Sequence, residues 1–104
     1  MQKQISAELD LIKKQPNKRY LYKDAFVHSL LLVLLYEKLI HKHHVVKQTV
    51  IYKDYLGIDR QTFQSHIINK AEEVAEAGIM VKKVGRNNFF KLNMEQVVKY
   101  LSEY

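Results

Sequence analysis

Two short segments of this sequence carry several side chains of the types that can form hydrogen bonds with nucleotides. The first segment carries Arg60, Gln61, Gln64, Ser65 and Asn69, and the second carries Lys82, Lys83, Arg86 and Asn87. Arginine, glutamine and asparagine have the donors and acceptors that match base edges, and lysine and arginine neutralise phosphates. These residues are the candidate nucleic-acid-binding residues.

Tyrosines and histidines suggest two further kinds of chemistry, each with a simpler alternative. Tyr20, Tyr22, Tyr52 and Tyr55 stand beside basic residues, an interleaving that could stack bases of single-stranded nucleic acid, but the simpler interpretation is core or rim packing, since the helical spacing of Tyr52 and Tyr55 favours burial of at least one ring. His41, His43 and His44 follow Glu37, yet no second ligand pair stands at a conventional metal-binding spacing, and histidines also favour helix C-termini. We expect no metal and no cofactor.

Motifs for catalysis are missing from the sequence. The glycines are isolated at positions 57, 78 and 85, so no glycine-rich phosphate loop is present, and the chain has no cysteine for a thiolate nucleophile. Its serines lack the partners of an activated nucleophile. We therefore expect a protein that is not an enzyme and has no catalytic residues.

Composition limits the class of protein. A chain of 104 residues with 47% hydrophobic residues is long enough for one packed domain. Its formal net charge of +6 attracts polyanions, of which nucleic acid comes first, followed by an acidic protein or a membrane surface. Segment 25–40 is too short and too polar to cross a membrane, and the N-terminus lacks a secretory signal. We expect a cytoplasmic protein.

Two helices are predicted before residue 41. Residues 1–17 form an accessory helix that ends at Pro16-Asn17, and a basic, aromatic linker leads to a second helix capped by Asp24. From Phe26 to Ile40 apolar residues cover nearly the whole circumference of that helix, so it must be buried on several sides. We expect part of this surface to contact a second copy or another protein through Phe26, Leu31 and Leu35, together with Leu101 of the last helix.

Three elements are expected to position the first polar segment. Val45-Val46 suits a short strand, and a helix capped by Gln48 or Thr49 continues to Leu56, before the turn at Gly57. Asp59 caps a third helix, which we expect to continue to Gly78. Its apolar face comprises Phe63, Ile67, Ala71 and Val74.

The second polar segment is predicted to lie on a β-hairpin. Residues 81–92 form two strands around Gly85-Arg86-Asn87-Asn88, with Lys82 and Lys83 on opposite faces. Asn93 and Gln96 then resemble a capping box at the start of a last helix, which either closes the core or contributes to a dimer seam. The expected fold is mainly α with a small hairpin, in which residues 18–104 form the main domain.

From Thr49 to Leu92 the sequence resembles the winged helix-turn-helix domains of bacteria and phages. The resemblance rests on Leu56-Gly57-Ile58, the capping Asp59, Thr62-Phe63, and Gly78-Ile79 before the hairpin. It implies that the third helix enters the DNA major groove and that the hairpin, the wing, touches phosphate or the minor groove. Lys53 departs from the family pattern, as does the long span from Gly57 to Gly78, and Glu72, Glu73 and Glu76 would repel phosphate.

In size and layout the chain is also similar to the small winged-helix proteins that accompany A-family DNA polymerases in staphylococcal cassette elements. This similarity implies a role in a replication complex of a mobile element. Two hypotheses result: a winged-helix protein that binds duplex or single-stranded DNA in replication or regulation, and an accessory subunit that holds a DNA polymerase or another replication enzyme. A homodimer is compatible with both.

Overall fold

The computed structural model describes residues 18–102, and the predicted accessory helix of residues 1–17 therefore lies outside the described residues. The elements are, in order, helix α2 (Lys18–Leu39), strand β1 (Val45–Lys47), the π-helix η1 (Val50–Leu56), helices α3 (Arg60–Asn69) and α4 (Ala71–Glu76), strands β2 (Ile79–Val84) and β3 (Asn87–Leu92), and helix α5 (Met94–Ser102). The protein is mostly helical with a small antiparallel sheet, as its sequence predicts.

Helix α2 forms the centre of the core. It begins at Lys18, so the prediction of a linker up to Asp24 is wrong: the helix continues through that segment. Every side chain from Leu30 to Leu35 is no more than 6% exposed. The helix contacts η1, β1 and β3, which explains how a helix that is apolar nearly all round is buried in a small protein. No helix within residues 18–102 is both long and apolar enough to cross a membrane.

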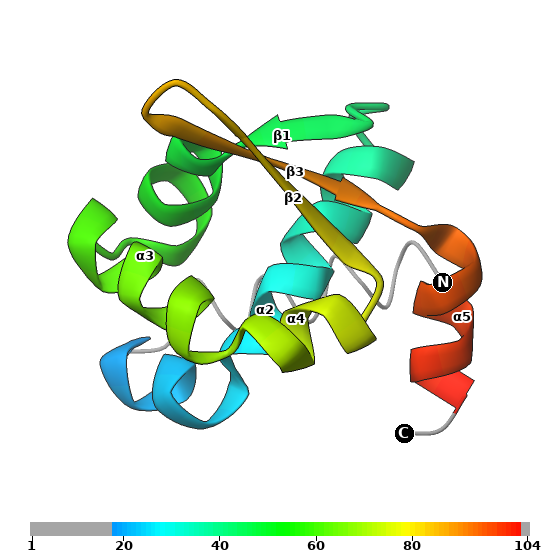
Figure 1. Ribbon diagram of the computed structural model, residues 1–104, viewed down its shortest axis with the longest axis horizontal. Coiled ribbons are helices and arrows are strands. Elements are labelled where there is room, and N and C mark those ends of the chain that lie inside the picture. Colours follow the sequence, from blue (N-terminus) through cyan, green and yellow to red (C-terminus); the bar gives the residue numbers. More distant parts are fainter. Residues whose placement is uncertain (1–17, 103–104) are drawn as a thin grey trace.

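The three strands form one antiparallel sheet in the order β1-β3-β2 (Figure 1). The predicted strand at Val45-Val46 is confirmed, and it pairs with β3 so that Val46 lies opposite Phe90. In the view of Figure 1, β1 lies at the top, β2 and β3 run diagonally downward to the right, and α2, α3 and α4 lie below β1. The inward side chains Val46, Phe90, Leu92 and Ile79 are at most 5% exposed and pack against these helices.

The segment before Gly57 differs from the α-helix that its sequence predicts. Val50–Leu56 is a π-helix, and Thr49 does not cap it: its backbone angles (φ −58°, ψ −42°) are already helical. Gly57 ends the element in the left-handed conformation with φ 65°, and its amide donates to the Tyr52 carbonyl, as does the amide of Ile58 at 3.0 Å. Gly57 is therefore a turn residue, as predicted, because a positive φ suits glycine.

The predicted third helix is two helices in the structure. The backbone of Lys70 (φ −113°, ψ 22°) departs from helical geometry, so α3 ends at Asn69 and α4 begins at Ala71. Glu72 and Glu73 occupy the first turn of α4, where the positive end of the helix dipole favours them. The acidic residues thus belong to a separate helix and not to the second half of α3.

Gly78 joins α4 to β2 and packs against α5. Its φ is 87°, and a Cβ atom added there would lie 2.8 Å from Val97 Cγ2. The predicted capping box of α5 is only half formed: Asn93 Oδ1 accepts from the Gln96 amide at 3.4 Å, but the Gln96 side chain donates to the Glu76 carbonyl at 2.8 Å. With Val97 fully buried, α5 closes the core and is tied to the end of α4.

Candidate nucleic-acid interface

Helix α3 is held by its cap and by one buried aromatic ring. Asp59 Oδ1 accepts a 2.7 Å hydrogen bond from the Thr62 amide, so the predicted N-cap is confirmed. Phe63 is fully buried, and its ring centroid lies 5.8 Å from that of Phe26 and 5.7 Å from that of Phe90. Contacts with both α2 and β3 fix the rotation of α3, which determines the face that solvent reaches.

The predicted polar residues of α3 share its outer surface. Arg60, Gln61, Ser65 and Asn69 are exposed and Gln64 is half-buried. One apolar residue that was not predicted as a site residue joins them, since Ile68 is 74% exposed. The signal for it was present in the sequence: Ile67 and Ile68 are adjacent, and on a helix with one buried face two adjacent side chains point in different directions.

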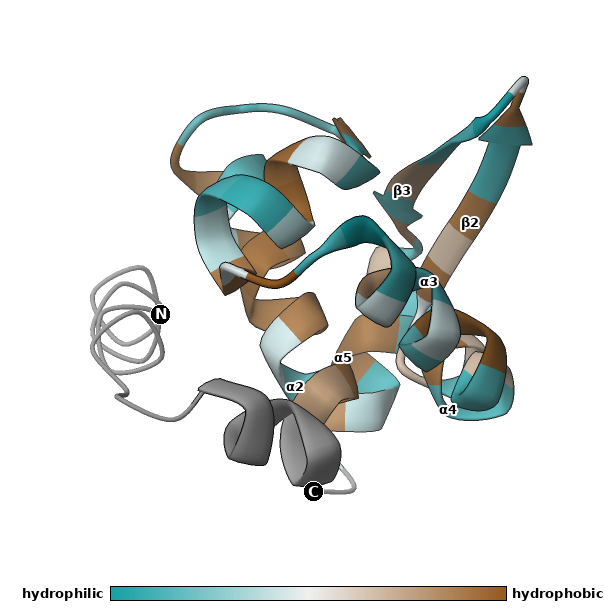
Figure 2. Ribbon diagram, turned by 90° about the vertical axis from the view of Figure 1, so that its left-hand side faces the viewer, coloured by the Kyte–Doolittle hydropathy of each residue, from teal (hydrophilic) through white to brown (hydrophobic). Residues whose placement is uncertain are grey.

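The hairpin has a tighter turn than its sequence predicts. β2 ends at Val84 and β3 begins at Asn87, which leaves Gly85 and Arg86 as the two turn residues and places Asn87 and Asn88 in the strand. Gly85 has a φ of 63° and Arg86 has no positive φ, which is the pattern of a type II′ turn. This turn matches the twist of the strands, so the hairpin projects as a regular ribbon beyond the helices (Figure 2).

Strand alternation separates the two lysines of β2. Lys83 pairs with Asn88, and the side chains of both line a cleft that lies between the hairpin and α3. Lys82 pairs with Phe89, and these two side chains lie on the other side of the sheet. The prediction that Lys82 and Lys83 lie on opposite faces is confirmed. Of the predicted hairpin residues, Lys83 and Arg86 lie at the cleft together with residues of α3, and Lys82 and Asn87 lie outside it.

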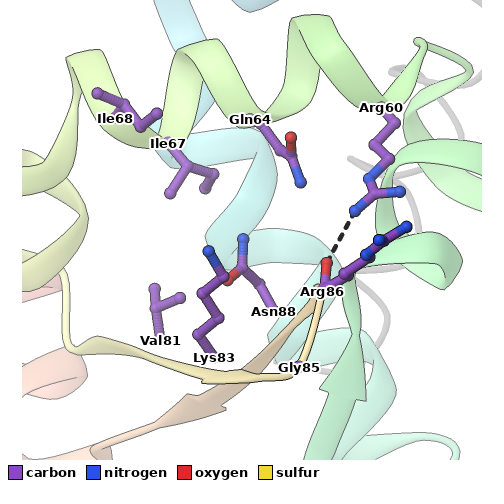
Figure 3. Close-up of a pocket in the computed structure, with 9 residues that line it drawn as sticks. All are labelled: Arg60, Gln64, Ile67, Ile68, Val81, Lys83, Gly85, Arg86 and Asn88. Carbon is purple, nitrogen blue, oxygen red and sulfur yellow. Dashed lines mark hydrogen bonds between the residues drawn. The ribbon is translucent and has the colours of Figure 1, made fainter.

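One hydrogen bond joins α3 to the turn of the hairpin. Arg60 Nη2 donates to the main-chain oxygen of Arg86 at a distance of 2.8 Å (Figure 3). Between the two elements lies a cleft of about 430 Å³. The residues that line it are Arg60, Gln64, Ile67, Ile68, Val81, Lys83, Gly85, Arg86 and Asn88. Figure 3 shows Lys83 and Asn88 extending from the hairpin toward α3, across from Gln64.

The charge of the cleft has one sign. Arg60, Lys83 and Arg86 are cations, and none of the lining residues is aspartate or glutamate. Ile67, Ile68 and Val81 supply an apolar wall, and Gln64 and Asn88 supply amides. An anion at the rim would meet arginine and lysine donors without a competing carboxylate, and a flat or apolar group could lie against the isoleucines.

The predicted partner interface lies mostly inside the protein. Phe26, Leu31 and Leu35 are 2%, 1% and 3% exposed, so they pack within the core of this chain and present no surface to a partner in this structure. Leu101 is half-buried on α5 and packs against the same core. The apolar side chains that solvent does reach include Val45, Ile68, Met80, Val81, Val84 and Val98.

The tyrosines and histidines that were considered for base stacking and metal binding are not among the residues that line the cleft. Glu37 is 4% exposed and accepts 2.7 Å hydrogen bonds from Tyr55 Oη and His43 Nδ1. Burial and the neighbouring Glu37 carboxylate raise the pKa of Tyr55 well above its ordinary value. Within the described part of the chain no group of three or more His, Asp or Glu side chains is placed to hold a metal ion. Tyr55 thus anchors the end of α2 to η1, and His43 ties it to the loop that follows α2.

His66 and Tyr52 take packing positions beside α3. The His66 ring stacks on Phe26 with centroids 4.9 Å apart, and the Tyr52 ring lies 5.7 Å from Phe63. The side chains of Tyr20 and Tyr22 are not among those that the structure describes.

No match to this chain was found among protein-family models, curated proteins or solved structures.

Proposed function

We propose that this chain is a winged helix-turn-helix protein that binds DNA without catalysing a reaction, in replication or regulation of a bacterial mobile element. The order η1, Gly57 turn, α3 and β2–β3 hairpin supports this proposal, because it corresponds to the helix, turn, helix and wing that the sequence resembles. In this proposal α3 contacts bases and the hairpin contacts phosphate.

The hydrogen bond between Arg60 and the turn of the hairpin carries the proposal. It holds the Arg60 guanidinium against the main chain of the hairpin turn, so a cation of α3 lies on the same rim as the turn that carries Arg86. A cation that is already held in place binds a polyanion at a lower entropic cost than a mobile side chain does. Nucleic acid is the polyanion that also matches the amides of the exposed Gln61 and the half-buried Gln64 on the same helix.

The break at Lys70 favours contact through α3. Glu72, Glu73 and Glu76 belong to α4, so the polar residues of α3 form a helix of their own without a carboxylate. Repulsion between these glutamates and phosphate then limits contact to the region from Arg60 to Asn69.

The adjacent lysines of β2 give a matched test of this interface. Duplex and single-stranded DNA of the same sequence are titrated into the wild type, Lys83→Gln and Lys82→Gln at several salt concentrations. Both variants lose one positive charge, but only Lys83 lines the cleft. We expect Lys83→Gln to reduce the slope of log affinity against log salt by about one, whereas Lys82→Gln retains most of the wild-type slope.

The result also separates the kinds of DNA contact. Tighter binding of the duplex supports insertion of α3 into the major groove, and tighter binding of the single strand supports a strand lying in the cleft. Equal reductions of the salt slope in Lys83→Gln and Lys82→Gln would show that net charge alone attracts DNA. Undetectable binding of both DNA forms by the wild type at low salt would refute the proposal.

A further inference from the structure

The outer face of the sheet is a surface that the proposed DNA interface does not use. Its side chains follow from strand alternation and register: Val45 and Lys47 from β1, Asn87, Phe89 and Lys91 from β3, and Met80, Lys82 and Val84 from β2. An antiparallel sheet with one solvated face normally carries polar residues there. Here Val45 is 55%, Met80 43% and Val84 54% exposed, so the face departs from that pattern.

Apolar and cationic side chains alternate across this outer sheet face. Phe89 lies between Lys47 and Lys82 on the neighbouring strands. One step along β3, Lys91 lies between Val45 and Met80. Neighbouring side chains on one face of a sheet are close enough to contact a common partner. On this face Val45, Met80 and Phe89 therefore each lie beside a lysine, and Val84 lies opposite Asn87.

The charge of the outer sheet face discriminates between occupants. It carries three lysines and no aspartate or glutamate. A second copy placed face to face would bring lysines against lysines, which is destabilising. Its complement is a surface that combines apolar side chains with carboxylates.

We propose that the outer sheet face docks an acidic amphipathic helix of a partner protein. The hydrogen bonds of the three strands lie in the plane of the sheet, so an occupant of the face binds through side chains and must satisfy its own backbone, as a helix does. Strands about 4.8 Å apart give three strands a width of roughly 10 Å, which matches the diameter of one helix. The proposal is independent of DNA binding, because it uses the opposite side of the hairpin from Lys83.

Two synthetic peptides test the proposal. Both are amphipathic helices of equal length with leucines along one face; glutamates flank the leucines in the first and lysines flank them in the second. Each is titrated into the isotopically labelled full-length protein, and amide NMR shifts are followed. We expect the acidic peptide to bind at least about tenfold more tightly than the basic one and to shift the amides of β1, β2 and β3 around Phe89.

Matched variants assign the binding to the face. Lys91→Glu should lower the affinity of the protein for the acidic peptide by about tenfold or more. Lys99→Glu, the same change on α5, should leave this affinity nearly unchanged. Val45→Ser and Val98→Ser form a second pair, since these valines are 55% and 59% exposed on β1 and α5 respectively. Only the change at Val45 should weaken binding of the acidic peptide. All four residues are exposed, so the variants are expected to fold, which circular dichroism checks.

Several outcomes would overturn the proposal. These are equal binding of the two peptides, no binding of the acidic peptide, or its binding with shifts confined to α3 and the cleft. A single-stranded oligonucleotide or an anionic vesicle that shifts the Phe89 region more strongly than the acidic peptide would assign the face to that ligand instead. DNA titrated into the same sample reports on the cleft, so a failure of DNA binding is distinguished from a failure of this docking site.

Discussion

Arg60 Nη2 donates a hydrogen bond of 2.8 Å to the main-chain oxygen of Arg86, which follows it by 26 residues in the chain. The bond connects the first turn of α3 with the turn of the β2–β3 hairpin. It ties the position of one cationic element to that of the other, although both residues are exposed to solvent.

Loss of the Arg60 guanidinium should affect binding more than stability. We expect Arg60→Ala to lower duplex affinity by about tenfold, because it removes a charge and releases the hairpin turn. The free energy of unfolding should fall by no more than about 1 kcal/mol, since an exposed hydrogen bond contributes little. Fluorescence anisotropy and urea denaturation measure the two effects. Arg60→Lys retains the charge, and wild-type affinity in that variant would show that binding needs a cation at this position and not the guanidinium group.

Removal of the Tyr55 hydroxyl should destabilise the protein. Tyr55 donates to the buried Glu37, and hydrogen bonds to charged groups contribute about 1.5–3 kcal/mol each. We expect Tyr55→Phe to lower the free energy of unfolding by an amount in that range, as measured by urea denaturation. Tyr52→Phe, a half-buried tyrosine on the same helix, is the matched control. A comparable loss in both variants would argue against a specific bond to Glu37.

Stability should also fall at alkaline pH because of Tyr55. Burial and Glu37 raise its pKa in the folded protein above the ordinary value of about 10, so the folded state retains a proton that the unfolded state releases. The stabilising effect is fully present below about pH 10 and is lost as the pH rises above it, by up to about 1.4 kcal/mol per pH unit. Urea denaturation across this range should show a shallower decline for Tyr55→Phe. Parallel curves for the two proteins would contradict the raised pKa.

Two glycines with positive φ should tolerate alanine differently. Gly78 (φ 87°) would place a Cβ 2.8 Å from Val97 Cγ2, whereas Gly85 (φ 63°) has no neighbour within 4 Å of that position. Both changes incur a left-handed strain of about 1–2 kcal/mol, and Gly78→Ala adds about 1–3 kcal/mol from overpacking. Thermal unfolding should therefore show a larger loss for Gly78→Ala. Equal losses would mean that α5 moves away at little cost.

The features that the sequence alone determined are those set by near neighbours in the chain. Asp59 caps α3 because its carboxylate needs only the amide of Thr62, and Gly57 and Gly78 end helices because a positive φ is a property of one residue. The hairpin also followed from alternation around a single turn glycine. These interactions span a few residues, so residue type and spacing were enough to predict them.

Other features depended on contacts between distant segments, and only the tertiary structure decided them. Packing against η1 and the sheet buried Phe26, Leu31 and Leu35, which their pattern alone assigned to a partner. Strand register placed Lys83 in the cleft and Lys82 on the outer sheet face, and the rotation of α3 about Phe63 brought Arg60 to the carbonyl of Arg86. Register and helix rotation are set by how the whole core packs. A sequence pattern shows that a helix or strand has an apolar face, but it does not show whether that face packs within the chain or against another protein.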